Sequence, residues 1–278
     1  MRIGVLSKVF VRPSLEAVLD AVATAGLECV QLNLESAGLA PMPEEIPRGL
    51  AASVREAAGV RGIGIASVQG TFNMSHPDVE FRRAGLRRFR LIVDACAPLG
   101  TSVMAICIGT RNRENMWGHH ADNDTPEAWR DMTACVGEAV RMAEGAGVTL
   151  ALEPEVTNIV DSAEKVRRLL DEIGSPNLKV TMDGANLFHA GELARMGEIL
   201  DQAFALVGRD IIVAHAKDLS RDGEAGHEAA GHGVLDYNRY LSLLRACQFD
   251  GPLLLHGLSE AQVPGCVQFL QEKLARMS

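Results

Sequence analysis

Short apolar runs alternate with longer stretches of helical periodicity along the whole chain of 278 residues. The apolar runs have the length and the β-branched composition of buried strands. The predicted strands are Arg2–Leu6, Cys29–Asn33, Ile63–Val68, Ser102–Ile108, Val148–Glu153, Leu178–Asp183, Ile211–His215 and Pro252–His256. Strands that alternate with helical segments in this way predict βα units joined by right-handed crossovers.

Capping residues support the predicted helices between these strands. Ser14 precedes a helical segment that stops at Gly26, and Ser162 and Gly174 bracket another one in the same manner. Pro126 stands where a further helix begins. Serine is favoured at helix N-caps, proline in the first turn and glycine just after the last turn. The spacing of these signals therefore agrees with the strand assignment.

The number of βα units predicts an α/β fold of the (β/α)8 barrel type. A chain of 278 residues has the usual length of such a barrel. No linker or low-complexity segment interrupts the pattern, so we expect one domain over residues 1–278. The main alternative, an open doubly wound sheet, carries a glycine-rich phosphate loop after an early strand. The loop Ser7–Ser14 has no glycine, which disfavours that fold.

Composition narrows the range of partners. The formal net charge of −9 disfavours binding to nucleic acid and to anionic membrane surfaces. Six cysteines without a CxxC pair suggest buried thiols in a reducing compartment. No apolar stretch reaches the length of a membrane span, and the apolar run after Met1 is too short for a signal peptide. We therefore expect a cytoplasmic protein.

Four of the predicted strands end in a side chain that can bind a metal ion. These are Glu153, Asp183, His215 and His256, at the ends of the fifth to eighth strands. Barrel enzymes keep their catalytic groups at the carboxyl ends of the strands. Two carboxylates and two imidazoles at one barrel mouth therefore predict a divalent-metal site. The alternative is that each group is paired separately at its own strand end.

The chain resembles the xylose-isomerase-like barrels, specifically the sugar phosphate isomerase and epimerase group. The segments that carry the resemblance are Leu152-Glu153-Pro154, Met182-Asp183, His215-Ala216-Lys217-Asp218 and Gly231-His232-Gly233-Val234-Leu235-Asp236. They occur in the family's order and at its strand ends. The resemblance extends over almost the whole chain and implies a (β/α)8 barrel that binds one divalent metal ion and acts on small carbohydrates.

The resemblance implies a ligand set with one substitution. The family's Glu, Asp and His correspond to Glu153, Asp183 and His215, whereas its final Glu is replaced by His256. His256 is then the fourth ligand or an unligated base, and Glu260 is the alternative ligand. The metal can be Mn, Co, Zn, Fe or Mg. A ligand set with fewer carboxylates holds Mg²⁺ less well and favours the other four ions.

Further residues are candidates for substrate contact and catalysis. The family's histidine after the sixth strand is replaced by Asn186, which can still bind a hydroxyl group or instead cap a helix. Lys217 shares the inward face of His215 and can hold an enolate oxygen or simply form an ion pair. In the long polar loop after the fourth strand, Arg111 can bind an anionic group and Trp117 can cover a sugar. Both can also belong to a solvated loop.

These assignments predict a metal-dependent isomerase or epimerase of a small sugar, keto sugar or polyol. The catalytic residues would be Glu153, His256 and Lys217. A dehydratase that acts on a keto sugar or inosose is the second candidate, because both reactions begin with proton removal beside a carbonyl. A non-catalytic sugar-binding barrel is a third possibility. A DNA-repair endonuclease of the same superfamily is disfavoured by the net charge. The sequence is compatible with a homo-oligomer and does not identify the substrate.

Overall fold

The computed structural model of the protein describes residues 1–277. Its strands are β1 (Arg2–Leu6), β2 (Cys29–Leu32), β3 (Gly64–Gln69), β4 (Val103–Cys107), β5 (Thr149–Glu153), β6 (Leu178–Asp183), β7 (Ile211–Asp218), β8 (Glu228–Ala229) and β9 (Pro252–Leu255). Its α-helices are α1 (Leu15–Thr24), α2 (Leu50–Gly59), α3 (Val79–Leu99), α4 (Pro126–Gly145), α5 (Ala163–Ile173), α6 (Met196–Val207), α7 (Tyr237–Ala246) and α8 (Val263–Ala275).

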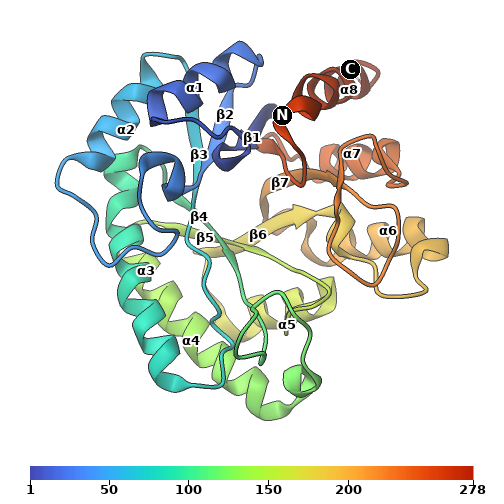
Figure 1. Ribbon diagram of the computed structural model, residues 1–278. Coiled ribbons are helices and arrows are strands. Elements are labelled where there is room, and N and C mark those ends of the chain that lie inside the picture. The colour runs from blue at the N-terminus through green and yellow to red at the C-terminus, as the bar shows by residue number, and fades with distance from the viewer. Residues whose placement is uncertain (278) are drawn as a thin grey trace.

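Eight parallel strands close into a barrel, as the sequence predicts. Each strand from β1 to β6 pairs with the next, β6 pairs with β7, β7 with β9, and β9 returns to β1. The helices lie around the outside of this sheet in chain order (Figure 1). The two-residue strand β8 is an addition that the sequence pattern did not predict. It pairs antiparallel with the end of β7 and lies outside the barrel ring.

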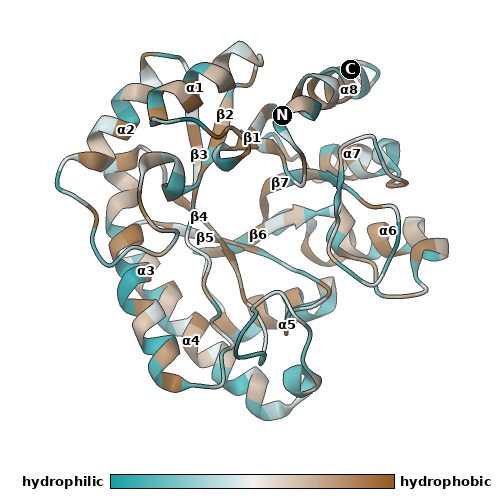
Figure 2. Cartoon of the chain, viewed as in Figure 1, coloured by the Kyte–Doolittle hydropathy of each residue, from teal (hydrophilic) through white to brown (hydrophobic). Residues whose placement is uncertain are grey.

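Side chains alternate between the two faces of each strand, and this alternation separates two apolar cores. The larger core lies between strands and helices and includes Leu152, Met182 and Leu255. A smaller cluster includes Ala151, Val213 and Leu254 and fills the barrel interior. Figure 2 shows the strands as largely hydrophobic and the helices with mixed surfaces. This division sets the direction of every strand-end side chain.

The same alternation directs the candidate ligands into the barrel mouth. Glu153, His215 and His256 each stand two residues after a member of the inner cluster, so they share its face. Strand β9 ends at Leu255, one residue earlier than predicted, so His256 is the first residue after the strand. Asp183 is the last residue of β6, as predicted. The four side chains therefore point to the same end of the barrel.

The predicted helix caps are present. The hydroxyl of Ser14 accepts a hydrogen bond from the backbone amide of Ala17, and Ser162 accepts one from Lys165. Gly174 follows α5 in the left-handed conformation, with φ of 65°, which glycine adopts without strain. Within residues 1–277, no helix combines the length and the apolar character needed to cross a membrane.

A buried carboxylate explains the glycine-containing segment after β8. Asp218, at the end of β7, accepts hydrogen bonds from the backbone amides of Leu219, Gly231 and Leu235. At Gly233, a Cβ atom would lie 2.4 Å from Asp218 Oδ1 and 2.3 Å from a backbone oxygen. Only glycine fits so close to this carboxylate. Asp218 therefore holds the loop between β7 and α7 against the barrel.

Two tyrosines of α7 bind the strand ends that carry the candidate ligands. The buried hydroxyl of Tyr240 lies 2.9 Å from the carbonyl oxygens of Met182 and His215, and it bridges β6 and β7. Tyr237 donates a hydrogen bond of 3.0 Å to the carbonyl oxygen of Lys217 alone. These contacts fix the backbone beside Asp183.

We predict that Tyr240→Phe lowers the free energy of unfolding by about 1–3 kcal/mol, because the buried carbonyl groups of Met182 and His215 lose the single O–H donor that they share. Tyr237→Phe also removes one donor, from the carbonyl group of Lys217, so its loss should be of the same order. Urea denaturation of both variants measures the two losses. A Tyr240→Phe protein as stable as the wild type would contradict this assignment.

Candidate active site

Four ligand-type side chains meet at the mouth of the barrel. Glu153, Asp183, His215 and His256 each offer one donor atom, and these atoms lie within 4.8 Å of one another. Nδ1 of His215 is 3.1 Å from Glu153 Oε1 and 3.5 Å from Asp183 Oδ2. Nδ1 of His256 is 3.9 Å from the same Asp183 oxygen. Donors that share one ion at roughly 2.0–2.2 Å are themselves roughly 3–3.5 Å apart. The group therefore has close to the dimensions of a single metal site.

Unsatisfied polar atoms gather at this point. In residues 1–277, five buried side-chain nitrogen or oxygen atoms lack a hydrogen-bond partner. Three of them are Asp183 Oδ2, His215 Nε2 and His256 Nδ1, which all belong to the four-residue group; of these, Asp183 Oδ2 has an ion-pair contact with Lys217 at 3.1 Å but accepts no hydrogen bond. A buried polar atom without a partner is costly and therefore rare. A cation bound between Asp183 and His256 would satisfy two of these atoms, so the residues present fit a metal ion.

The charges in the group are strongly coupled. Burial opposes ionisation of Asp183, but the Lys217 ammonium, 3.1 Å away, and His215 outweigh it and hold the carboxyl pKa well below its usual range. For His215, burial is likewise outweighed by Glu153 and Asp183, which raise its pKa to about 9. Burial and the charge of Lys217 lower the pKa of His256 to about 4. His256 is therefore neutral at pH 7, the form that can bind a metal ion.

Three neighbours hold Glu153 in place. Its Oε1 atom accepts a hydrogen bond from Nδ2 of Asn186 at 3.0 Å and lies beside His215. Its Oε2 atom lies 3.7 Å from the buried thiol of Cys107. Asn186 also donates to the carbonyl oxygen of Pro154 and accepts from the amide of Gly226. The Asn186 amide is thus fully occupied and does not line the cavity. Asn186 therefore holds the side chain of Glu153, and it is not placed to make the predicted contact with substrate.

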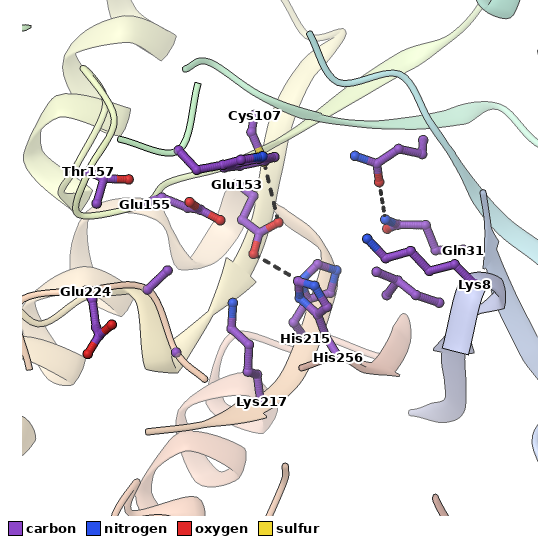
Figure 3. A pocket seen from close by; sticks show the side chains of 15 residues that line it. Lys8, Gln31, Cys107, Glu153, Glu155, Thr157, His215, Lys217, Glu224 and His256 are labelled. Atoms are coloured by element: carbon purple, nitrogen blue, oxygen red, sulfur yellow. Dashed lines mark hydrogen bonds and ion pairs between the residues drawn. The ribbon is translucent and has the colours of Figure 1, made fainter. Parts of the chain in front are cut away.

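A cavity of about 440 Å³ opens directly above the four-residue group. Glu153, His215, His256 and Lys217 line it from the barrel strands (Figure 3). The two long loops contribute as well, with Trp117 from one and the segment 224–226 from the other. Trp117 is 46% exposed, so its ring is available to a ligand. The cavity has the size expected for a site that encloses a small molecule.

Glu155 is a cavity residue that was not among the predicted site residues. Its side chain lines the cavity, is only 7% exposed, and forms no ion pair with any residue in 1–277. Burial, and next the charge of Glu153, raise its pKa to about 8. The signal was present in the segment Glu153-Pro154-Glu155, because residues two apart on an extended strand share a face. Lys8 and Gln31, after β1 and in β2, are further lining residues that were not identified.

The structure does not bring Arg111 or Glu260 to the cavity. The guanidinium of Arg111 is buried and turned away, 2.9 Å from Asp131 Oδ2. Its backbone amide is held by Asn123. Arg111 thus connects its loop to α4 through an ion pair. Its guanidinium is not placed to bind an anionic group in the cavity, contrary to the prediction from the sequence. Glu260 is 42% exposed and pairs with Arg12 at 2.5 Å, so it lies outside the group that contains His256.

The fold agrees with comparisons to known proteins. Residues 19–271 match the family model described as xylose isomerase-like TIM barrel, and the chain belongs to this family. One curated relative is L-ribulose-5-phosphate 3-epimerase UlaE of Escherichia coli, 25% identical over 194 residues. The match covers 70% of this chain but only 63% of the relative, which is less than two thirds of its length.

Solved structures show the same fold. A D-tagatose 3-epimerase-like protein superposes with a TM-score of 0.77 at 18% identity, over 99% of this chain and 97% of that one. The probable 3-DHS dehydratase AsbF of Bacillus anthracis superposes with a TM-score of 0.73 at 13% identity, over 98% and 99% of the two chains. Identities this low establish the shared barrel and leave the reaction to be argued from the site.

We predict that Arg111→Met lowers the free energy of unfolding by about 1–2 kcal/mol, a value reduced for the partial exposure of Asp131. Asp131→Asn should have a similar effect, and the double variant should lose less than the sum of both. Arg113→Met, in the exposed part of the same loop, is the control and should change stability by less than about 0.5 kcal/mol. An Arg111→Met protein of unchanged stability would contradict the anchoring role.

Proposed function

We propose that the protein is a divalent-metal-dependent epimerase or isomerase of a small keto sugar. The observation that carries this proposal is the group of four donors at the bottom of a polar cavity. The family and the sugar epimerases among its relatives support the substrate class. The activity of L-ribulose-5-phosphate 3-epimerase, which the chain matches over part of its length, is the specific reaction we consider first.

Glu153, Asp183, His215 and His256 would hold the metal ion. Once bound, a divalent cation supplies Lewis-acid polarisation of a carbonyl oxygen. His256 is better suited to be a ligand than a base, since its unpaired Nδ1 faces Asp183 and its ring is neutral. Two carboxylates and two imidazoles favour Mn²⁺, Co²⁺, Zn²⁺ or Fe²⁺ over Mg²⁺. The pKa of His215 is raised to about 9, so this residue would have to release its proton when the metal ion binds. The metal ion would then neutralise Asp183, and the ammonium group of Lys217 would move away from Asp183 toward the bound sugar.

Glu155 would transfer the proton. It is a carboxyl group that faces the cavity and forms no ion pair with any of residues 1–277, whereas Glu153 is held by Asn186 and His215. Once ionised, Glu155 would accept a proton from the carbon beside the carbonyl while the electron pair moves to the carbonyl oxygen; because its pKa is raised to about 8, this step should become faster as the pH rises toward 8. The Lys217 ammonium would stabilise the negative charge on that oxygen. Glu153, the second carboxylate of the cavity, would take up a proton from solvent and give it to the opposite face of the carbon in an epimerisation. Trp117 would cover the sugar.

A dehydratase is the second candidate function. The supporting observation is the replacement of the family's last carboxylate by His256, which leaves fewer groups for proton return from a second face. Elimination needs one base beside the carbonyl and a hydroxyl group that leaves. Both reactions begin by removing the same proton, but only elimination expels a hydroxyl group and gives an unsaturated product.

We predict that the Mn²⁺-loaded protein, incubated in D₂O with L-ribulose 5-phosphate or D-tagatose, incorporates deuterium at the carbon beside the carbonyl. Glu155→Gln should lower kcat by about 10²–10⁴, the range for loss of a general base, while bound metal stays constant. Glu272→Gln, exposed on α8, is the control and should behave as wild type. NMR and mass spectrometry separate the epimer from a dehydrated product. Binding of sugars without exchange would point to a sugar-binding barrel instead.

We predict that His256→Ala weakens metal binding by at least about 10- to 100-fold, the cost usual even for a group that only supports a ligand. Glu260→Ala is the matched control and should keep full metal content, since Glu260 pairs with Arg12 at the surface. Metal titration followed by elemental analysis measures both. If His256→Ala kept its metal but lost kcat, His256 would be a base, and loss of metal in Glu260→Ala would reverse the assignment.

A further inference from the structure

The charged side chains that line the cavity are not equally neutralised. Lys217 is paired with Asp183, Glu224 with Arg221, and Glu153 lies beside His215. Within residues 1–277, Lys8 and Glu155 are the acidic or basic lining side chains that form no ion pair. In Figure 3 the two lie on opposite sides of the cavity, with Glu155 beside Thr157 and Lys8 beside Gln31. The cavity therefore has one side with carboxylates and another with a free cation.

The backbone that carries Lys8 is firmly held. Lys8 lies in the 3₁₀ turn η1 (Ser7–Val9), directly after β1. The buried hydroxyl of Ser7 accepts a hydrogen bond from the amide of Asn33 and contacts Ser36 at 2.9 Å. The amide of Lys8 donates to Asn33 Oδ1 at 3.4 Å, and that of Phe10 to the carbonyl oxygen of Ser7. The backbone of Lys8 is thus held in one conformation. A ligand that binds the ammonium group therefore has to order only the flexible side chain.

The wall beside Lys8 consists of hydrogen-bond donors. Ser67 donates to Gln31 Oε1, Gln31 donates to Gln69 Oε1 at 2.6 Å, and Gln69 donates to Thr71 at 2.6 Å. In this series of hydrogen bonds, the side-chain oxygens of Gln31 and Gln69 both accept. Each side-chain nitrogen uses one of its hydrogens, and the structure describes no acceptor for the other. A primary amide has two such hydrogens. Gln31 and Gln69 both line the cavity, so these hydrogens are available to oxygens of a ligand.

We propose that Lys8 makes the cavity selective for keto sugars with an anionic terminal group, a phosphate ester or a carboxylate. The keto-sugar part of this statement rests on the proposed function. The carbonyl end of the ligand lies at the donor group around Glu153, and its charged end lies at Lys8 and the two glutamines. An ammonium group binds a phosphate ester and a carboxylate alike, as a point charge. The structure therefore indicates that the terminal group is anionic and does not distinguish a phosphate from a carboxylate.

Binding measurements on the metal-loaded protein test this proposal without requiring turnover. The probes are two matched pairs that differ in the terminal group, L-ribulose 5-phosphate with L-ribulose and D-fructuronate with D-fructose. We expect the wild type to bind the anionic member of at least one pair more tightly by about 5- to 10-fold, the value for a charge-assisted contact at a partly exposed site. The pair that shows the preference identifies the anion. The preference should fall as salt is added.

Three variants separate the role of Lys8 from general effects. Lys8→Gln should bring the affinity ratio within each pair close to one and leave binding of the neutral sugars unchanged. Lys8→Arg keeps the charge and should keep the preference. Lys273→Gln makes the same change in net charge on α8, far from the cavity residues, and should behave as wild type.

An unchanged ratio in Lys8→Gln, or a wild type with no preference for either anion, would overturn the proposal. Failure of the anionic ketoses to bind at all would overturn it as well. A preference that depends on Lys8, in a protein that exchanges no substrate proton with solvent, would instead support Lys8 and contradict the proposed epimerase activity. The two proposals can therefore fail separately.

Discussion

The arrangement of the site depends on the burial of one carboxylate, Asp183. Its side chain is fully buried at the end of β6, and a charge in such a position needs partners. Lys217, His215 and His256 approach its Oδ2 atom, and the amide of Ala185 donates to its Oδ1 atom. These partners come from three neighbouring strand ends. The need to balance this charge thus explains why polar groups from separate strands meet at one point.

The features that the sequence predicted well are those set by local periodicity. The period of two along a strand placed Glu153, His215 and His256 on the interior face, and the glycine and serine signals placed the helices. The same rule applied one step further would have found Glu155. Arg111 shows the limit of such reasoning. Its partner, Asp131, is 20 residues away on a helix, and only the folded chain reveals that the charge is already used.

The cavity has two sides of different character, and each would interact with one part of a ligand. Carboxylates and imidazoles lie at the strand ends on one side, close to the loops that contain Trp117 and Glu224. Lys8, Gln31 and Gln69 lie on the side of β1 to β3. Members of a barrel family can keep the metal-binding strand ends and change the remaining wall, so the reaction type and the substrate preference can vary independently.

We propose above all that one divalent cation binds between the four strand-end donors. Crystals of the protein grown with Mn²⁺ and measured at the manganese absorption edge test this most directly. We expect one anomalous peak at roughly 2.0–2.3 Å from Glu153, Asp183, His215 and His256, with Lys217 displaced from Asp183. A map without a peak at this point, in which the Lys217 ammonium still neutralises Asp183, would contradict the claim.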